Sequence, residues 1–74
     1  MTTVEKTLMN NIRTKRAERG LTVSDLAFGM GANPAQVYCW ENGKYFPGVN
    51  NLCLLADELD CTVDELLGRG GSNG

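Results

Sequence analysis

The fold is constrained most by one stretch of the sequence, TVSDLAFGMGANPAQVYCW, because it holds the start and stop signals of two short helices. Thr22 is a good N-cap residue, and Asp25 follows it at the third helical position. Gly31 stands where the chain must reverse, since glycine adopts positive φ without steric cost. Asn33 and Gln36 form the pattern of a capping box that starts a second helix. These signals, in this order and so close together, predict a helix-turn-helix motif.

The second helix of this motif has an apolar inner face and an outer face without charge. Val37 and Trp40 face inward, while Ala35 and Cys39 point directly away from them. A helix usually shows solvent a charged outer face. An outer face without acidic residues instead suits insertion into the major groove of DNA, where a carboxylate would be repelled by phosphate.

Two further segments carry a specific resemblance. Residues 40–44 read Trp-Glu-Asn-Gly-Lys and are followed by Pro47, and residues 63–68 read Val-Asp-Glu-Leu-Leu-Gly. Together with the small residue Ala27 in the first helix of the motif and Gly31 in its turn, these segments resemble the Cro/repressor-type helix-turn-helix family. This family is also described as lambda-repressor-like or as the xenobiotic-response-element family. The resemblance covers about residues 8–68, nearly the whole chain.

The resemblance implies an all-α fold of five helices, with the helix-turn-helix in helices two and three. It also implies a sequence-specific, repressor-like transcriptional regulator from a prokaryote or a phage, with double-stranded DNA as its partner. Such a protein acts in the cytoplasm, and we expect it to bind a palindromic operator as a homodimer. Dimer contacts would come from Leu59, Cys61 or the surface of the fifth helix.

The resemblance further implies which residues meet DNA, with a recognition helix over about residues 34–41. Base edges would be reached by Pro34, Ala35, Gln36 and Cys39, and the DNA backbone by Asn33, Tyr38, Asn42, Lys44 and Tyr45. Gln36 is the one side chain among them that suits bidentate pairing with adenine. Ala35 can pack on a thymine methyl group.

Apolar periodicity and capping signals predict helices over residues 4–19, 23–30, 34–41 and 49–59, and a short fifth helix capped by Thr62. Val4, Leu8 and Ile12 give the first helix its inner stripe. One domain over residues 1–68 accounts for all five helices, because 74 residues lie near the lower limit for folding without disulfides or metals. We expect the glycine-rich tail, residues 69–74, to be flexible.

Arg16 continues the spacing of the inner stripe and so brings a cation to the edge of the core, where it needs a partner. Glu41 lies beside Val37 on the helical wheel and is the best candidate. The matching positions form an ion pair in the family that the chain resembles. We therefore predict an Arg16–Glu41 ion pair that ties the first helix to the recognition helix, the alternative being two independent surface charges.

The formal net charge of the chain is −2, but its distribution matters more than its size. Residues 1–47 carry six cations against four acidic residues, a net +2, whereas residues 48–74 carry one cation against five acidic residues, a net −4. The N-terminal part can therefore face phosphate while the C-terminal part faces away. The basic footprint is thin, so we expect a monomer to bind DNA weakly.

No cofactor, metal ion or small-molecule ligand is expected. The chain has no histidine, and its three cysteines have no metal-type spacing, which excludes the usual mixed zinc sites. We expect Cys53 and Cys61 to be small buried hydrophobes. No apolar run approaches ~20 residues and the N-terminus is polar, so we expect neither a membrane span nor a signal peptide.

A second hypothesis is a protein-interaction module of the same fold, an accessory or antitoxin-like partner with little or no DNA binding. It would use Phe28, Tyr38 and Phe46 and the acidic C-terminal part. Phe28 is either half-buried or part of a partner surface, and Phe46 is expected to pack under its loop. An enzyme is not expected, because Cys39 is the only candidate nucleophile and the pattern places no base beside it.

Overall fold

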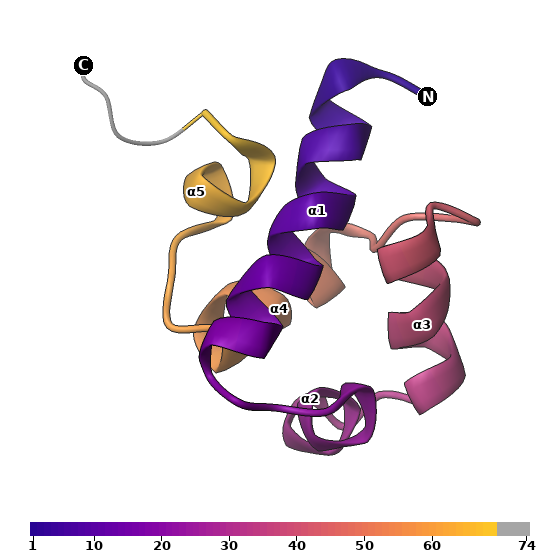
Figure 1. Ribbon diagram of the computed structural model, residues 1–74, viewed down its shortest axis with the longest axis vertical. Coiled ribbons are helices and arrows are strands. Elements are labelled where there is room, and N and C mark those ends of the chain that lie inside the picture. Colours follow the sequence, from indigo (N-terminus) through magenta and orange to yellow (C-terminus); the bar gives the residue numbers. More distant parts are fainter. Residues whose placement is uncertain (70–74) are drawn as a thin grey trace.

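Five α-helices make up the computed structural model of the chain, which describes residues 1–69 (Figure 1). They are α1 (Thr3–Glu18), α2 (Val23–Met30), α3 (Pro34–Asn42), α4 (Val49–Glu58) and α5 (Val63–Leu67). The described part contains no strand, so the predicted all-α fold with five helices is confirmed. Each predicted helix agrees with the observed one to within a residue at either end. The predicted flexible tail, beyond Arg69, lies outside the described residues.

Local sequence decides where the helices begin and end. α1, α2, α3 and α5 all start with a capping box, in which the N-cap side chain and the third helical residue bond to each other's backbone N–H groups. α4 has Gly48 as its N-cap residue and therefore begins without a side-chain cap. Gly31 and Gly43 close α2 and α3 with φ of 71° and 73°, a left-handed conformation that other residues adopt at a cost. These two glycines therefore fix the lengths of both helices of the motif.

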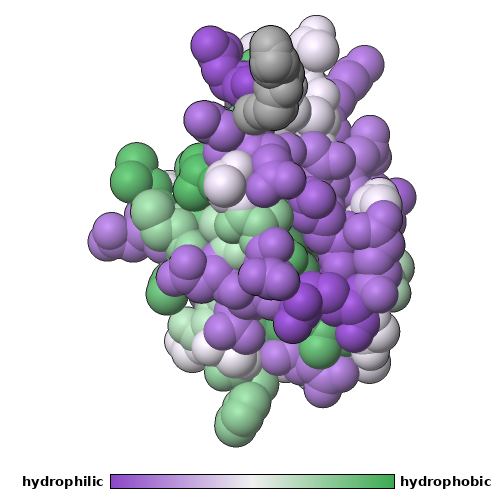
Figure 2. Space-filling model, turned by 90° about the vertical axis from the view of Figure 1, so that its left-hand side faces the viewer, coloured by the Kyte–Doolittle hydropathy of each residue, from purple (hydrophilic) through white to green (hydrophobic). Residues whose placement is uncertain are grey.

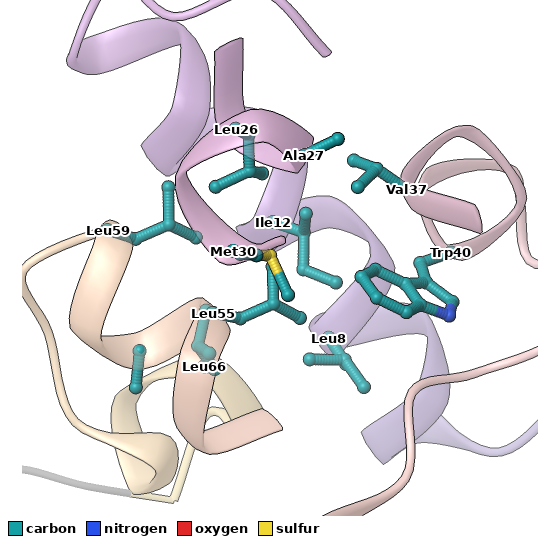
Figure 3. Packing of buried hydrophobic residues seen from close by; sticks show 11 residues of the cluster. Leu8, Ile12, Leu26, Ala27, Met30, Val37, Trp40, Leu55, Leu59 and Leu66 are labelled. Carbon is teal, nitrogen blue, oxygen red and sulfur yellow. The ribbon is translucent and has the colours of Figure 1, made fainter. Parts of the chain in front are cut away.

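The core lies where all five helices meet (Figure 3). Trp40 is 1% exposed, and its ring points from α3 toward Leu8 and Ile12 of α1. The buried apolar residues are Leu8, Ile12, Leu26, Ala27, Met30, Val37, Trp40, Leu55, Ala56, Leu59 and Leu66. Their burial supplies the main favourable term for folding so short a chain, at ~1.5–3 kcal/mol for each large side chain.

Two expectations about burial are wrong, and one open alternative is decided. Val4 is exposed, because the first turn of α1 extends past the helices on either side of it (Figure 1). Cys53 is exposed as well, since it follows Leu52 on α4 and one helical step turns it away from the buried stripe. Phe28 is 89% exposed, which excludes the half-buried alternative and leaves the other one, a partner surface, open. Phe46 and Cys61, by contrast, are half-buried and pack against the core.

α1 stands between α5 and α3 and holds the C-terminal end of each with a polar side chain (Figure 1). On one side Asn11 Nδ2 donates to the carbonyl oxygens of Glu65 and Leu66, both at 3.1 Å. On the other side Arg13 Nη2 donates to the carbonyl oxygen of Glu41 at 3.0 Å. The last carbonyls of a helix have no partner within it, so these bonds both satisfy them and fix α3 and α5 relative to α1.

Candidate nucleic-acid interface

The outer face of α3 is open along most of its length. Asn33, Pro34, Ala35, Gln36 and Tyr38 are exposed in the folded chain. α3 lies on the flank of α1 opposite α5, with α2 at its N-terminal end (Figure 1). The capping box at Asn33 and the core contacts of its inner face hold the helix in this position, so its outer face is presented to solvent by a rigid scaffold.

Gln36 has a second role at the N-terminus of α3. Its Oε1 atom accepts a hydrogen bond from the backbone N–H of Asn33 at 3.2 Å, and Asn33 Oδ1 accepts one from the Ala35 N–H at 2.8 Å. Bidentate pairing with adenine needs the same Gln36 oxygen as an acceptor, together with its amide N–H. The capping contact and the pairing predicted from the sequence therefore use the same oxygen atom.

The turn after α3 brings together the residues that were predicted to meet phosphate. Asn42 Nδ2 donates to the Tyr38 carbonyl oxygen at 2.7 Å, which leaves one N–H of this amide group directed elsewhere. Lys44 is exposed and follows Gly43 directly. Between residues 33 and 48 the only charged side chains are those of Glu41 and Lys44, and Glu41 is in an ion pair. The interface thus presents a single positive charge.

Cys39 and Tyr45 lie against each other across this turn. The hydrogen bond between the Tyr45 hydroxyl and the Cys39 thiol raises the pKa of Tyr45, and desolvation adds to the rise. Cys39 is half-buried, so the outer face is less open here than at Ala35.

The Arg16–Glu41 ion pair is present and anchors the C-terminal end of α3. Arg16 Nε lies 2.6 Å from Glu41 Oε2 and Nη2 lies 3.0 Å from Oε1, a bidentate arrangement. The Glu41 side chain is only 7% exposed and that of Arg16 18%. Arg16 Nη1 also donates to the Leu21 carbonyl oxygen at 2.7 Å. The hydrogen bond to Glu41 raises the pKa of Arg16, so this cation stays charged and engaged.

Two other cations near the C-terminal end of α1, Lys15 and Arg19, lie beside acidic residues of the C-terminal part of the chain. Arg19 Nη1 is 4.0 Å from Asp60 Oδ2. The pKa of Glu65 is lowered mainly by its hydrogen bonds with Thr62, and the charge of Lys15 lowers it further. The net +2 of residues 1–47 is therefore not all available to phosphate.

Arg13 is the residue of this region that sequence reasoning missed. Its guanidinium group bonds to the backbone of Glu41, one helical turn before Arg16 on the same side of α1. The spacing of three residues between the two arginines was visible in the sequence. A backbone carbonyl has no sequence signature, however, so the partner of Arg13 could not be identified without the angle between α1 and α3.

The comparison with protein families agrees with this architecture. A family model described as helix-turn-helix, of the lambda-repressor-like, xenobiotic-response-element type, matches residues 12–66. No significant match to a curated protein or to a solved structure was found. None of the helices within residues 1–69 combines the length and apolar character needed to cross a bilayer. The same residues contain no cluster of three side chains that could hold a metal ion.

Proposed function

The chain belongs to the lambda-repressor-like helix-turn-helix family, and we propose that it is a sequence-specific DNA-binding transcriptional regulator of repressor type. The observation that carries the proposal is the outer face of α3, which is exposed and free of negative charge. A helix is about 10–12 Å across with its side chains, and the major groove of B-DNA is about 12 Å wide. α3 is therefore narrow enough to enter the groove.

Each exposed side chain of α3 has a distinct part in this proposal. Gln36 exchanges its bond to the Asn33 N–H for an adenine edge, and Ala35 packs on a thymine methyl group. Pro34 and Cys39 make apolar contacts with base edges. Pro34 is exposed, whereas Cys39 is half-buried and contributes the part of its side chain that remains open. The backbone contacts are assigned to Asn33, Tyr38, Asn42, Lys44 and Tyr45.

We propose that the protein binds as a homodimer, with its two recognition helices ~34 Å apart on a palindromic operator. A single domain offers few charged contacts with phosphate, so two linked half-sites are needed for useful affinity. Leu59 is buried and cannot contact a second copy, which corrects one of the expected dimer residues. The remaining candidates for the dimer contact are Cys61 and α5. The neighbouring helix α4 adds two exposed apolar side chains, Val49 and Leu54. Figure 2 shows this C-terminal side, where hydrophobic surface gathers toward one edge of a mainly hydrophilic face.

The proposal places the protein in the cytoplasm of a prokaryote or of a phage-infected cell, and it involves no cofactor or small-molecule ligand. Selection of bound sequences from random duplex DNA at low salt tests it directly. We expect a palindromic consensus, with affinity that falls as salt rises. Failure to bind any duplex at low salt would contradict the proposal.

A protein-interaction module remains the second candidate because of one observation, the nearly complete exposure of Phe28 on α2. A large exposed aromatic side chain is typical of partner surfaces, although single ones are common. Phe46 no longer supports this candidate, since it packs against the core. Purification of a stable heterocomplex that retains no DNA would favour it, and Phe28→Ser should then disrupt that complex.

A further inference from the structure

Two arginines of α1 hold the same residue of α3 by different atoms. Arg16 binds the carboxylate of Glu41, as its burial requires, while Arg13 binds the backbone carbonyl oxygen of Glu41 at 3.0 Å. Arg16 is part of the packed structure. Arg13 is otherwise exposed, so its contact with Glu41 is its main interaction with the rest of the molecule.

The carbonyl group that Arg13 binds belongs to the last turn of α3, where helix carbonyls lack intrahelical partners. The N–H groups of Gly43 and Lys44 both bond to the Cys39 carbonyl oxygen, so neither is available to Glu41. A guanidinium cation at this end of a helix also interacts favourably with the helix dipole. Arg13 therefore completes the C-terminal cap of α3 from a neighbouring helix.

α1 also packs directly against the turn that follows α3. A Cβ atom placed on Gly43 would lie 3.0 Å from Met9 Sδ, so Met9 of α1 touches the turn from the same side as Arg13. The direction of Asn42 and Lys44 thus depends on contacts made by α1. Small displacements matter here, because a phosphate contact requires a specific distance and angle.

We propose that Arg13 is a positioning residue for DNA binding, which holds the end of α3 and the following turn so that Asn42 and Lys44 meet the phosphate backbone. In this proposal Arg13 acts through α3 and not through a phosphate contact of its own, because its Nη2 atom donates to the Glu41 carbonyl oxygen. This inference rests on the proposed function of DNA binding. It differs from the simpler possibility that Arg13 is one more cation that neutralises a phosphate.

The first test uses the free protein and needs no DNA. Arg13→Met removes the hydrogen bond while keeping a long, helix-compatible side chain. We expect the amide hydrogen of Lys44 to exchange about tenfold faster, with exchange at buried Leu55 unchanged. Arg19→Met is the matched control, because Arg19 lies at the end of the same helix but faces Asp60. Unchanged exchange at Lys44 in Arg13→Met would overturn the proposal.

The second test measures affinity for a duplex selected by the wild-type protein, over a range of salt concentrations. We expect Arg13→Met to bind about five- to tenfold more weakly with an unchanged dependence on salt. Loss of a direct phosphate contact would instead reduce the slope of log K against log salt by about 0.9 for each domain bound. Lys44→Met is the variant expected to give that reduction.

The outcomes separate the two proposals. If the wild type binds DNA and Arg13→Met binds equally well, or binds with a reduced salt slope, the positioning role is wrong while the proposed function stands. If the wild type binds no duplex at all, the proposed function is wrong, and the role of Arg13 in DNA binding is wrong with it.

Discussion

Gln36 has one oxygen atom for two partners, the Asn33 N–H that it binds and the adenine edge that we propose, and a single substitution can separate them. A glutamate at this position can still accept the hydrogen bond from the Asn33 N–H that the capping box needs. Its negative charge near the helix N-terminus also stabilises the helix by ~0.3–1 kcal/mol. The same carboxylate cannot donate to adenine and is repelled by DNA. We predict that Gln36→Glu keeps or raises the melting temperature but weakens specific binding by ~1–3 kcal/mol or more. Circular dichroism melting and fluorescence anisotropy measure the two effects.

Gln36→Ala is the informative comparison, because it loses the cap and the base contact together. It should melt lower than Gln36→Glu and also bind weakly. Wild-type affinity in Gln36→Glu would show that this side chain does not read a base.

Individual residues show where sequence reasoning works and where it stops. From the sequence, Gln36 was predicted both to cap α3 and to pair with a base. That both functions use the same Oε1 atom became visible only in the structure, where Oε1 accepts the Asn33 N–H. Arg16 and Glu41 could be paired because both are charged and one lies on a buried stripe. Arg13 could not, since its partner is a backbone atom. The prediction for Cys53 was wrong because it relied on how often cysteine is buried. The exposure of Cys53 is decided instead by its position on α4, which turns it away from the core.

The Arg16–Glu41 pair joins two elements, so removal of one partner should destabilise the whole domain. With Glu41 nearly buried, Arg16→Met leaves a carboxylate without its counter-ion, at a cost of ~3 kcal/mol. We predict that the double variant Arg16→Met/Glu41→Leu is more stable than the single variant Arg16→Met, since no buried charge then remains unpaired. Urea unfolding of the wild type and of both variants measures the difference. A double variant that is no more stable than Arg16→Met would contradict this interpretation.

The capping boxes of α2 and α5 make stability depend on pH. Hydrogen bonds with Thr22 lower the pKa of Asp25 below its ordinary value of 3.8, and bonds with Thr62 lower the pKa of Glu65 below 4.5. A lowered pKa in the folded state means that the contribution is present above the unfolded pKa and is lost as pH falls through the folded pKa. We predict that the free energy of unfolding decreases as pH falls from about 5 to about 2.

Asp25→Asn/Glu65→Gln tests this assignment, because amide oxygens can still accept the capping bonds but do not titrate in this range. The decrease with pH should be smaller in this double variant. An identical decrease in both proteins would assign the acid sensitivity to other carboxylates.

At the scale of elements, the sequence predicted the helices well because their caps are local. Four capping boxes and the glycines that follow α2 and α3 involve residues close together in the chain. The packing of α1 between α3 and α5 depends on contacts such as Asn11 with Leu66, which are 55 residues apart. Such contacts follow from the assembled core and were not visible in local patterns.

The charge of the whole molecule is arranged so that its acidic end lies away from the proposed interface. Arg16 is held by Glu41, Arg19 Nη1 lies 4.0 Å from Asp60 Oδ2, and Arg13 donates to the Glu41 carbonyl oxygen, so half of the six cations of residues 1–47 already have a partner. Lys44 is the one charge on the turn after α3 that is free of an ion pair. The split of +2 and −4 read from the sequence therefore overstates the positive charge that DNA would meet.

This arrangement predicts an unusually shallow salt dependence for a DNA-binding protein. One phosphate neutralised by Lys44 in each domain gives a slope of log K against log salt near −0.9, and therefore about −1.8 for a dimer on two half-sites. Anisotropy titrations at several salt concentrations measure this slope, and sedimentation of the complex gives the number of chains on each duplex. A slope steeper than about −4 would mean that further cations reach the DNA. The domain would then have to lie on the duplex in an orientation that brings α1 close to the phosphates.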